Sequence, residues 1–311
     1  MTEAAQRRAS ETAVGNASNV RVERSPLAST VAMVTGKCSF LAVAVNVLPI
    51  CRTCGVQFGA SERPPEVCPI CEDARQWVPV DGQRWTTMDE LAATHVNTVR
   101  RDGELIGIGT EPRFAIGQRA LVVPSAIGNV LWECVTLLDD ATAQAVEALG
   151  GLAAIAISHP HYHSAMVEWA QRFDCSVLIH AADAEWIMRP DDAIELWDGD
   201  TRELGGLTLL RLGGHFPGGT VLHRPGGAGT LLSGDIVQVI PDRGWVSFMY
   251  SYPNLIPLPA AEVERMAAAL EPFAFETIQG AWWGTTIPRD GKAIVQRSAE
   301  RYVRALKGEP I

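Results

Sequence analysis

The chain has 311 residues, of which 47% are apolar and 20% charged, as in an ordinary soluble globular protein. Its formal net charge of −10 disfavours nucleic acid and anionic membrane surfaces as partners, because both repel an acidic protein. The apolar stretch 40–49 is shorter than the roughly 20 residues of a membrane span, so we expect a cytoplasmic protein without a membrane partner.

The first 45 residues contain no clear structural element. Residues 1–28 are polar, with scattered arginines and no period, which is typical of disorder. Residues 29–45 are more apolar but connect to nothing obvious. We predict a disordered or non-native extension over 1–45, a cysteine module over 46–86 and the main domain over 87–311.

Four of the seven cysteines form two CxxC knuckles. Cys51 and Cys54 form the first, and Cys68 and Cys71 the second, with 13 residues between the knuckles. Two knuckles complete a tetrahedral set of four sulfurs around one ion. The segment resembles the rubredoxin-like end of rubrerythrins, although Glu72 stands where rubredoxins usually carry glycine. We expect a small zinc ribbon holding Zn²⁺, with iron as the alternative ion.

Short strands and helices alternate after the cysteine module. The capping box Thr87–Glu90 predicts a helix start. Strands are predicted over 104–108, 119–123, 129–134, 152–157, 176–180, 207–212, 220–223, 230–232 and 273–278. Helices are predicted over 140–149, 164–173, 181–188, 261–270 and 290–306. This order indicates an α/β (α+β) fold in which two sheets pack together with helices outside.

Histidines gather in the second half of the chain, where six of the seven lie between positions 159 and 223. His159 and His161 follow an apolar run, and alternate residues of an extended stretch point the same way. His215 lies between glycine pairs, and Asp235 follows another strand end. Since imidazole and carboxylate are the ligands of a borderline divalent cation, we predict that these four residues bind one metal ion.

This pattern resembles the metallo-β-lactamase fold superfamily over about residues 96 to 300. The resemblance implies an αββα sandwich with metal at one edge of the two sheets, where the superfamily motif is HxHxDH. His159 and His161 match its first two histidines, His215 matches the next one, and Asp235 matches the aspartate that bridges two metals.

The chain departs from the superfamily motif at three places. His163 stands in place of the aspartate and Ser164 in place of the adjacent histidine, and residues 280–284 hold tryptophans where the final histidine is expected. Ser164 is expected to cap the following helix. Because most ligands of a second ion are missing, we predict a single metal, Zn²⁺ or alternatively iron. One divalent cation with Asp235 and a hydroxide is also electrically neutral.

The predicted function is hydrolysis of an ester, thioester or lactone through a metal-bound hydroxide. His163 or Asp235 would accept or relay the proton. For His163, a hydrogen bond within the loop and a role as an extra ligand are the other interpretations. The aromatic segment 245–257 predicts an apolar pocket wall, with core packing or a dimer contact as alternatives. We expect a small-molecule substrate with an apolar part, and a homodimer.

Two other functions are compatible with the same residues. Two histidines and a carboxylate also form the facial triad of mononuclear non-haem iron oxidoreductases, and persulfide dioxygenases of the superfamily are similar in using one iron. An inactive protein that binds metal is the third hypothesis, because so much of the second site is missing.

Overall fold

Two mixed β-sheets form the centre of residues 46–311, the part of the chain that this computed structural model describes. The seven strands of the first sheet, in spatial order, are β3 (Val96–Asp102), β4 (Leu105–Glu111), β5 (Arg119–Ser125), β6 (Gly128–Trp132), β7 (Ala154–Ala156), β8 (Ser176–His180) and β9 (Ile194–Trp197). The six of the second are β10 (Thr201–Leu204), β11 (Leu207–Arg211), β12 (Thr220–Arg224), β13 (Thr230–Gly234), β18 (Thr277–Gly280) and β19 (Thr286–Ile287). The predicted extension over 1–45 lies outside the described residues.

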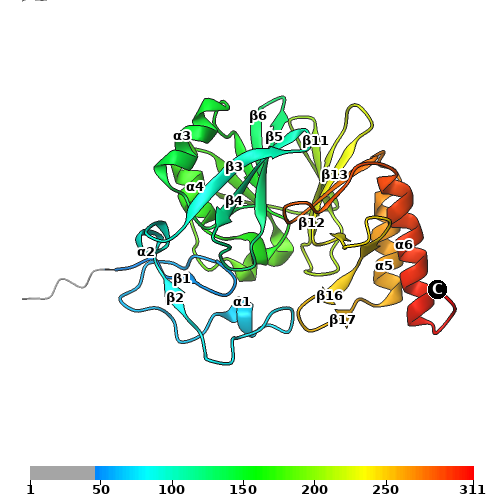
Figure 1. The fold of residues 1–311 in the computed structure, drawn as a ribbon, viewed down its shortest axis with the longest axis horizontal. Coiled ribbons are helices and arrows are strands. Elements are labelled where there is room, and N and C mark those ends of the chain that lie inside the picture. Colours follow the sequence, from blue (N-terminus) through cyan, green and yellow to red (C-terminus); the bar gives the residue numbers. More distant parts are fainter. Residues whose placement is uncertain (1–45) are drawn as a thin grey trace, which may run out of the picture. The chain divides into compact units, whose positions relative to one another are not determined.

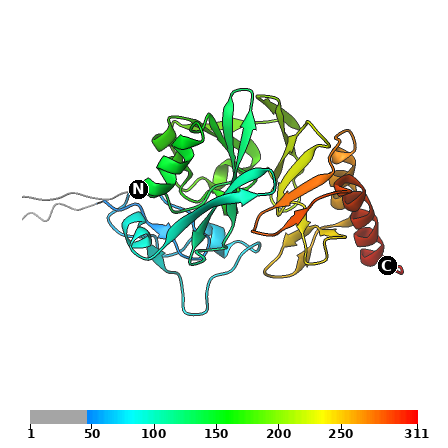
Figure 2. The same cartoon turned by 45° about the horizontal axis from the view of Figure 1, so that its top comes forward.

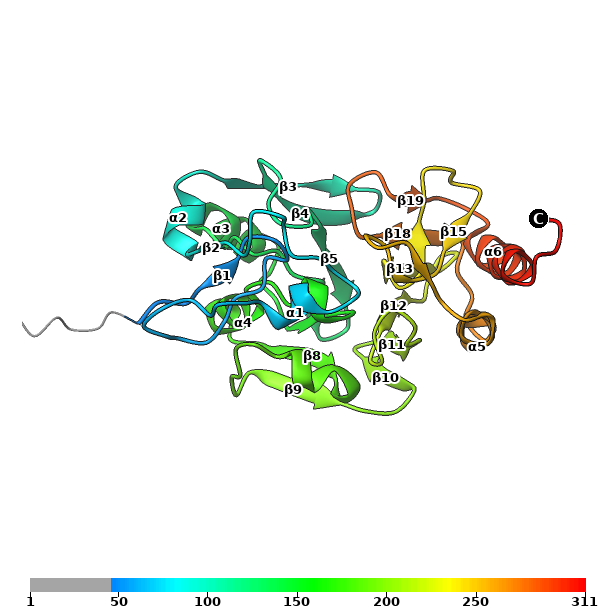
Figure 3. The same cartoon turned by 90° about the horizontal axis from the view of Figure 1, so that it is seen from below.

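Helices cover the outer face of each sheet (Figures 1 and 3). The first sheet carries α3 (Asp140–Ala148) and α4 (Met166–Phe173), and the second carries α5 (Ala260–Leu270) and α6 (Gly291–Leu306). The predicted apolar face of α5 is confirmed, because Val263, Met266, Ala267 and Leu270 are all buried. The layers therefore follow the predicted αββα order.

The core between the sheets follows from the two-residue period of the strands. In β5, Leu121 and Val123 face the second sheet, while Ala120 and Val122 face the helices. Both faces of this strand are buried, which explains its continuous apolar sequence. Leu209, Leu222 and Leu232 of the second sheet complete the contact between the sheets.

Strand direction brings the chemistry to one edge. Strands β6, β7 and β8 are parallel, and β13 is parallel to β18. The carboxyl ends of parallel strands meet at the same edge of a sheet, so the residues after β7 and after β13 lie where the two sheets can present them together. A short 3₁₀ turn, η1 (Pro160–Tyr162), follows β7 directly.

The cysteine module packs beside this edge and comprises β1 (Ile50–Cys51), α1 (Pro69–Glu72) and β2 (Trp85–Thr86) (Figure 2). The backbone N–H of Gln57 donates to the Ser164 carbonyl (2.9 Å), so the module is hydrogen-bonded directly to the loop that carries His159 and His161, called the histidine loop below. The capping box predicted at Thr87 is present and begins α2 (Met88–Ala92).

Several predicted elements differ in detail. Helix α4 begins at Met166 because Ser164 has a φ of +48° and its hydroxyl donates to the Cys134 carbonyl, so the predicted cap at Ser164 is wrong. The predicted helix over 181–188 is the 3₁₀ segment η2 (Ala181–Trp186). Two small hairpins were not predicted: β14 (Gln238–Val239) pairs with β15 (Val246–Ser247), and β16 (Met249–Ser251) pairs with β17 (Ile256–Pro257). No helix within 46–311 is long and apolar enough to cross a bilayer.

Candidate metal centre and its pocket

Three histidines and one aspartate meet at the edge shared by the two sheets. His159 follows β7 in an extended conformation, His161 lies in η1, and His215 lies in the loop between β11 and β12. Asp235 follows β13 directly. The expected extended geometry for His161 is wrong, because Pro160 begins a 3₁₀ turn instead. The turn nevertheless keeps the rings of His159 and His161 only 5.0 Å apart.

The distances between the ligand atoms match those around one cation. Two ligands of a tetrahedral Zn²⁺ at 2.0–2.1 Å lie about 3.4 Å apart. His159 Nε2 lies 3.4 Å from Asp235 Oδ1, and His161 Nδ1 lies 3.2 Å from His215 Nε2. The ligand atoms of the three histidines all lie within 4.8 Å of one another. The three histidines are therefore brought together, and Asp235 lies beside His159.

Protonation also suits a cation. His215 Nδ1 donates to the Tyr250 carbonyl (2.7 Å), which leaves its Nε2 lone pair free. Burial lowers the pKa of His215 to about 4 and the pKa values of His159 and His161 well below the usual range. Neutral imidazole is the form that binds a metal. Burial raises the pKa of Asp235 to about 7, so its carboxylate needs a nearby positive charge.

Unpaired polar atoms indicate the same position. His159 Nε2 and Asp235 Oδ1 are buried and have no hydrogen-bond partner among residues 46–311. Buried polar atoms in native proteins nearly always have a partner. A cation bound between these side chains would supply one, so the residues fit a single divalent ion.

His163 lies apart from this group. Its Nδ1 donates to the Trp186 carbonyl (3.2 Å), and its ring borders a separate void of about 10 Å³. The Ser164 hydroxyl accepts from Gln118 (2.9 Å) and donates to Cys134. Both residues at the second-metal positions thus make hydrogen bonds within the loop, while His163 Nε2 is buried without a partner among residues 46–311. The predicted number of ions stays a prediction. The hydrogen-bonding interpretation of His163 is the one that this geometry favours.

Glu133 is a buried acid that the sequence did not single out. It follows β6, has a φ of +66°, and its Oε2 accepts from the Ser158 amide (3.2 Å). Burial raises its pKa to about 8. The carboxyl group therefore holds the start of the histidine loop. A lone acid after an apolar strand was the only sequence signal for this role.

A cavity of about 150 Å³ opens onto the ligands. His161, His215 and Asp235 form one side of it. The remaining wall residues come from four segments of the chain and are Gln76, Trp77, Arg113, Ile116, Tyr252, Pro253 and Trp282. Trp282 thus lines the pocket within the segment where the superfamily's final histidine was expected, and it donates to the Ile116 carbonyl (2.9 Å).

The four cysteines of the module form the second cluster of ligand atoms found within the described residues. Cys51 Sγ lies 3.6 Å from Cys71 Sγ, and Cys54 Sγ lies 3.7 Å from Cys68 Sγ. Sulfurs of a tetrahedral site at 2.3 Å lie about 3.8 Å apart. All four thiols are buried, and burial raises the pKa of Cys54, so a cation is needed to hold the cluster as thiolates.

Relatives of this chain are of two kinds. No protein-family model matches it. The uncharacterized protein YmaE of Bacillus subtilis (strain 168) is 48% identical over 267 residues, which cover 84% of this chain and 97% of that protein. The chain belongs to the YmaE family.

Solved structures show the fold of this YmaE-family chain. The metallo-β-lactamase DIM-1 superposes with a TM-score of 0.51 at 15% identity, covering 67% of this chain and 97% of that one. The mono-zinc form of the metallo-β-lactamase FIM-1 from Pseudomonas aeruginosa has a TM-score of 0.50 at 15% identity, covering 67% and 96%. The main domain therefore has the metallo-β-lactamase fold, as predicted, with a four-cysteine module before it.

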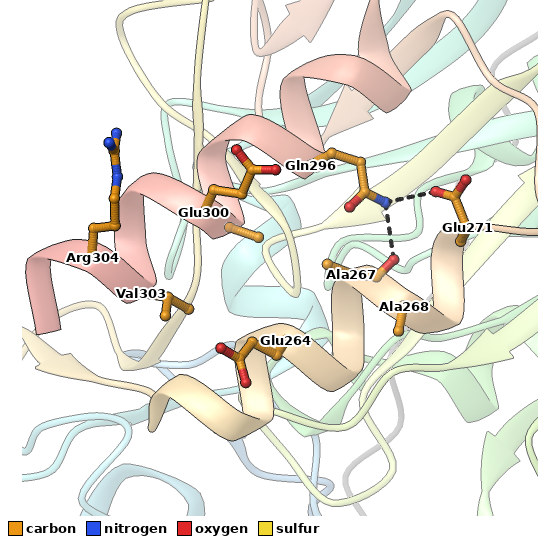
Figure 4. Close-up of a pocket in the computed structure, with 9 residues that line it drawn as sticks. Glu264, Ala267, Ala268, Glu271, Gln296, Glu300, Val303 and Arg304 are labelled. Atoms are coloured by element: carbon orange, nitrogen blue, oxygen red, sulfur yellow. Dashed lines mark hydrogen bonds between the residues drawn. The ribbon is translucent and has the colours of Figure 1, made fainter. Parts of the chain in front are cut away.

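A larger depression of about 660 Å³ lies between α5 and α6 of the YmaE-family chain (Figure 4). Glu264, Glu300 and Arg304 are among the residues that line it. The side-chain Nε2 of Gln296 donates to the Ala267 carbonyl (3.1 Å). None of the predicted metal ligands lines it. The smaller cavity at the histidines is therefore the candidate active site.

Metal content tests the histidine centre. The wild-type protein is expected to hold two ions per chain, and His161→Ala or Asp235→Ala one, because the removed ligand is part of the four-residue set. His163→Ala and the matched control His180→Ala should both retain two. Elemental analysis after dialysis against a weak chelator gives the counts. Loss of an ion from His163→Ala with retention in His161→Ala would contradict the assignment.

Removal of one cysteine tests the module. Cys68→Ser is expected to lose the second ion and to lower Tm by at least about 5 °C, because metal binding and folding of such modules are coupled. Cys175→Ser, a partly buried thiol after α4, should change neither value. Absorbance separates the two candidate ions, since a four-sulfur iron site is red and a zinc site is colourless. An unchanged ion count in Cys68→Ser would refute the site.

Proposed function

We propose that this YmaE-family protein is a metal-dependent hydrolase that acts on an ester, thioester or lactone at a mononuclear site. The supporting observation is the group of three neutral imidazoles and one carboxylate that opens onto a cavity at the edge of a metallo-β-lactamase fold. The six cysteines within residues 46–311 form no disulfide with one another, which supports a cytoplasmic location. The expected homodimer stays a prediction.

The proposed division of roles follows from position. His159, His161 and His215 would hold the ion, and Asp235 would supply the negative charge beside it. A divalent cation bound there would lower the pKa of a coordinated water and polarise the substrate carbonyl. Zn²⁺ is the ion that this donor set favours, with iron as the alternative.

Asp235 is the proposed proton acceptor. Its side chain lines the cavity with His161 and His215, whereas His163 borders a different void. An ion held by the three histidines would bring its coordinated water next to this carboxylate, which can accept a proton as a general base. Asp235 would take the proton at a carboxylate oxygen and pass it to the leaving group.

The walls of the cavity support a small substrate with an apolar part. Ile116, Pro253 and Trp282 offer apolar surface next to the ligands. Binding sites for small molecules are mostly apolar with a few placed polar groups. The substrate's apolar group would lie against these side chains, with its carbonyl toward His161 and His215.

An iron oxidoreductase is the second candidate. The observation that favours it is the contact between the cysteine module and the histidine loop. The backbone N–H of Gln57 donates to the Ser164 carbonyl there. Iron at the four cysteines could supply single electrons, which zinc does not.

Turnover by protein purified without oxygen separates these functions. The hydrolase proposal predicts zinc at the histidine centre and cleavage of chromogenic esters or lactones, with kcat/KM at least about 100-fold lower in Asp235→Ala. His223→Ala, whose Nε2 bonds the Ala274 carbonyl (2.9 Å), is the matched control and should keep wild-type activity.

Other outcomes would overturn the hydrolase proposal. Iron at the histidine centre with oxygen uptake in the presence of a persulfide would favour the oxidoreductase. A protein that is fully loaded with metal but inert towards both sets of substrates would instead be a binding protein.

A further inference from the structure

The cysteine module forms one wall of the cavity at the histidine centre. Gln76 and Trp77 line it together with His161, His215 and Asp235. Both residues follow the second CxxC knuckle by only a few positions. The wall is therefore built from a segment that the metallo-β-lactamase fold of the main domain does not include.

This wall is fixed in place by polar contacts on both sides. The Asn254 side chain donates to the Ala74 carbonyl and to the Gln76 carbonyl, each at 2.9 Å. The Arg75 guanidinium lies 4.2 Å from the Phe216 ring centroid and 4.8 Å from that of Tyr250. These contacts tie the segment to the loop that carries His215, so its position relative to the ligands is set.

The Gln76 side chain is only 4% exposed, and its Oε1 has no hydrogen-bond partner within the described part of the chain. A buried amide oxygen without a partner is unfavourable and calls for an explanation. Gln76 borders the cavity. A ligand in the cavity becomes the partner of this oxygen once the side-chain amide turns toward the cavity.

We propose that Gln76 determines substrate specificity by accepting a hydrogen bond from a hydroxyl or N–H group on the acyl part of the substrate. The inference rests on the proposed hydrolase function. A cavity of about 150 Å³ holds one benzene-sized molecule. The part of the acyl group inside the cavity is therefore small, with about six non-hydrogen atoms, and it carries a hydrogen-bond donor near the carbonyl.

Binding of small hydroxamates tests this role without turnover. Glycolohydroxamate and acetohydroxamate differ by one hydroxyl, and both are metal-binding probes. Calorimetry on the metal-loaded protein should show that glycolohydroxamate binds about 3- to 10-fold more tightly, the range expected for one hydrogen bond. Gln76→Leu should abolish the preference.

Two further variants make the result specific. Gln171→Leu, an exposed glutamine on α4, is the matched control and should keep the preference. Asn254→Ala keeps the Gln76 side chain but removes the contacts that position it, so the preference should also fall. An undiminished preference in Gln76→Leu, or loss of the preference in Gln171→Leu, would overturn the inference.

Ester turnover separates this inference from the function on which it rests. The p-nitrophenyl esters of glycolate and acetate should show the same preference in kcat/KM, reduced in Gln76→Leu. If wild-type protein shows the hydroxamate preference but cleaves neither ester, the hydrolase proposal fails while Gln76 keeps its role in binding. If both esters are cleaved equally and Gln76→Leu changes neither rate, Gln76 has no such role.

Discussion

The site depends on one constraint: three imidazoles and a carboxylate are buried close together, and a shared cation is the partner that we propose for them. His159 Nε2 and Asp235 Oδ1 lie 3.4 Å apart, and neither has a hydrogen-bond partner within residues 46–311. Without a positive charge, burial keeps the imidazoles neutral and raises the pKa of the carboxyl group. The fold places these groups together through the strand ends, the 3₁₀ turn at Pro160 and the loop of His215. Their burial without a partner is unfavourable, and a divalent ion between them would offset that cost.

The cysteine module is part of the site rather than an attachment to it. The Gln57 amide bonds the histidine loop, and Asn254 of the main domain holds the carbonyls on either side of Arg75. Through Gln76 the module reaches the cavity beside the histidines. Metal binding by the cysteines can thus influence the shape of the pocket, because folding of such a module depends on its ion.

Much of the fold could be predicted because its signals are local. Strand β8 has the predicted bounds, Ser176–His180, and the apolar face of α5 follows a simple period. The strands β3, β9 and β10 were missed because they lie at or next to sheet edges, where exposed polar residues obscure the alternation. The four candidate ligands were singled out because His159, His161 and Asp235 follow strand-like runs and His215 lies between glycine pairs. Gln76 could not be found, since its role depends on contacts between segments more than 80 residues apart.

X-ray absorption at the edge of the bound metal tests the central claim most directly. With zinc at both sites, the account predicts a nitrogen and oxygen shell at about 2.0–2.1 Å and a sulfur shell at about 2.3 Å. In Cys68→Ser the sulfur shell should disappear while the nitrogen and oxygen shell stays. A wild-type spectrum with sulfur neighbours alone, from protein that was offered excess zinc, would contradict a cation at His159, His161, His215 and Asp235.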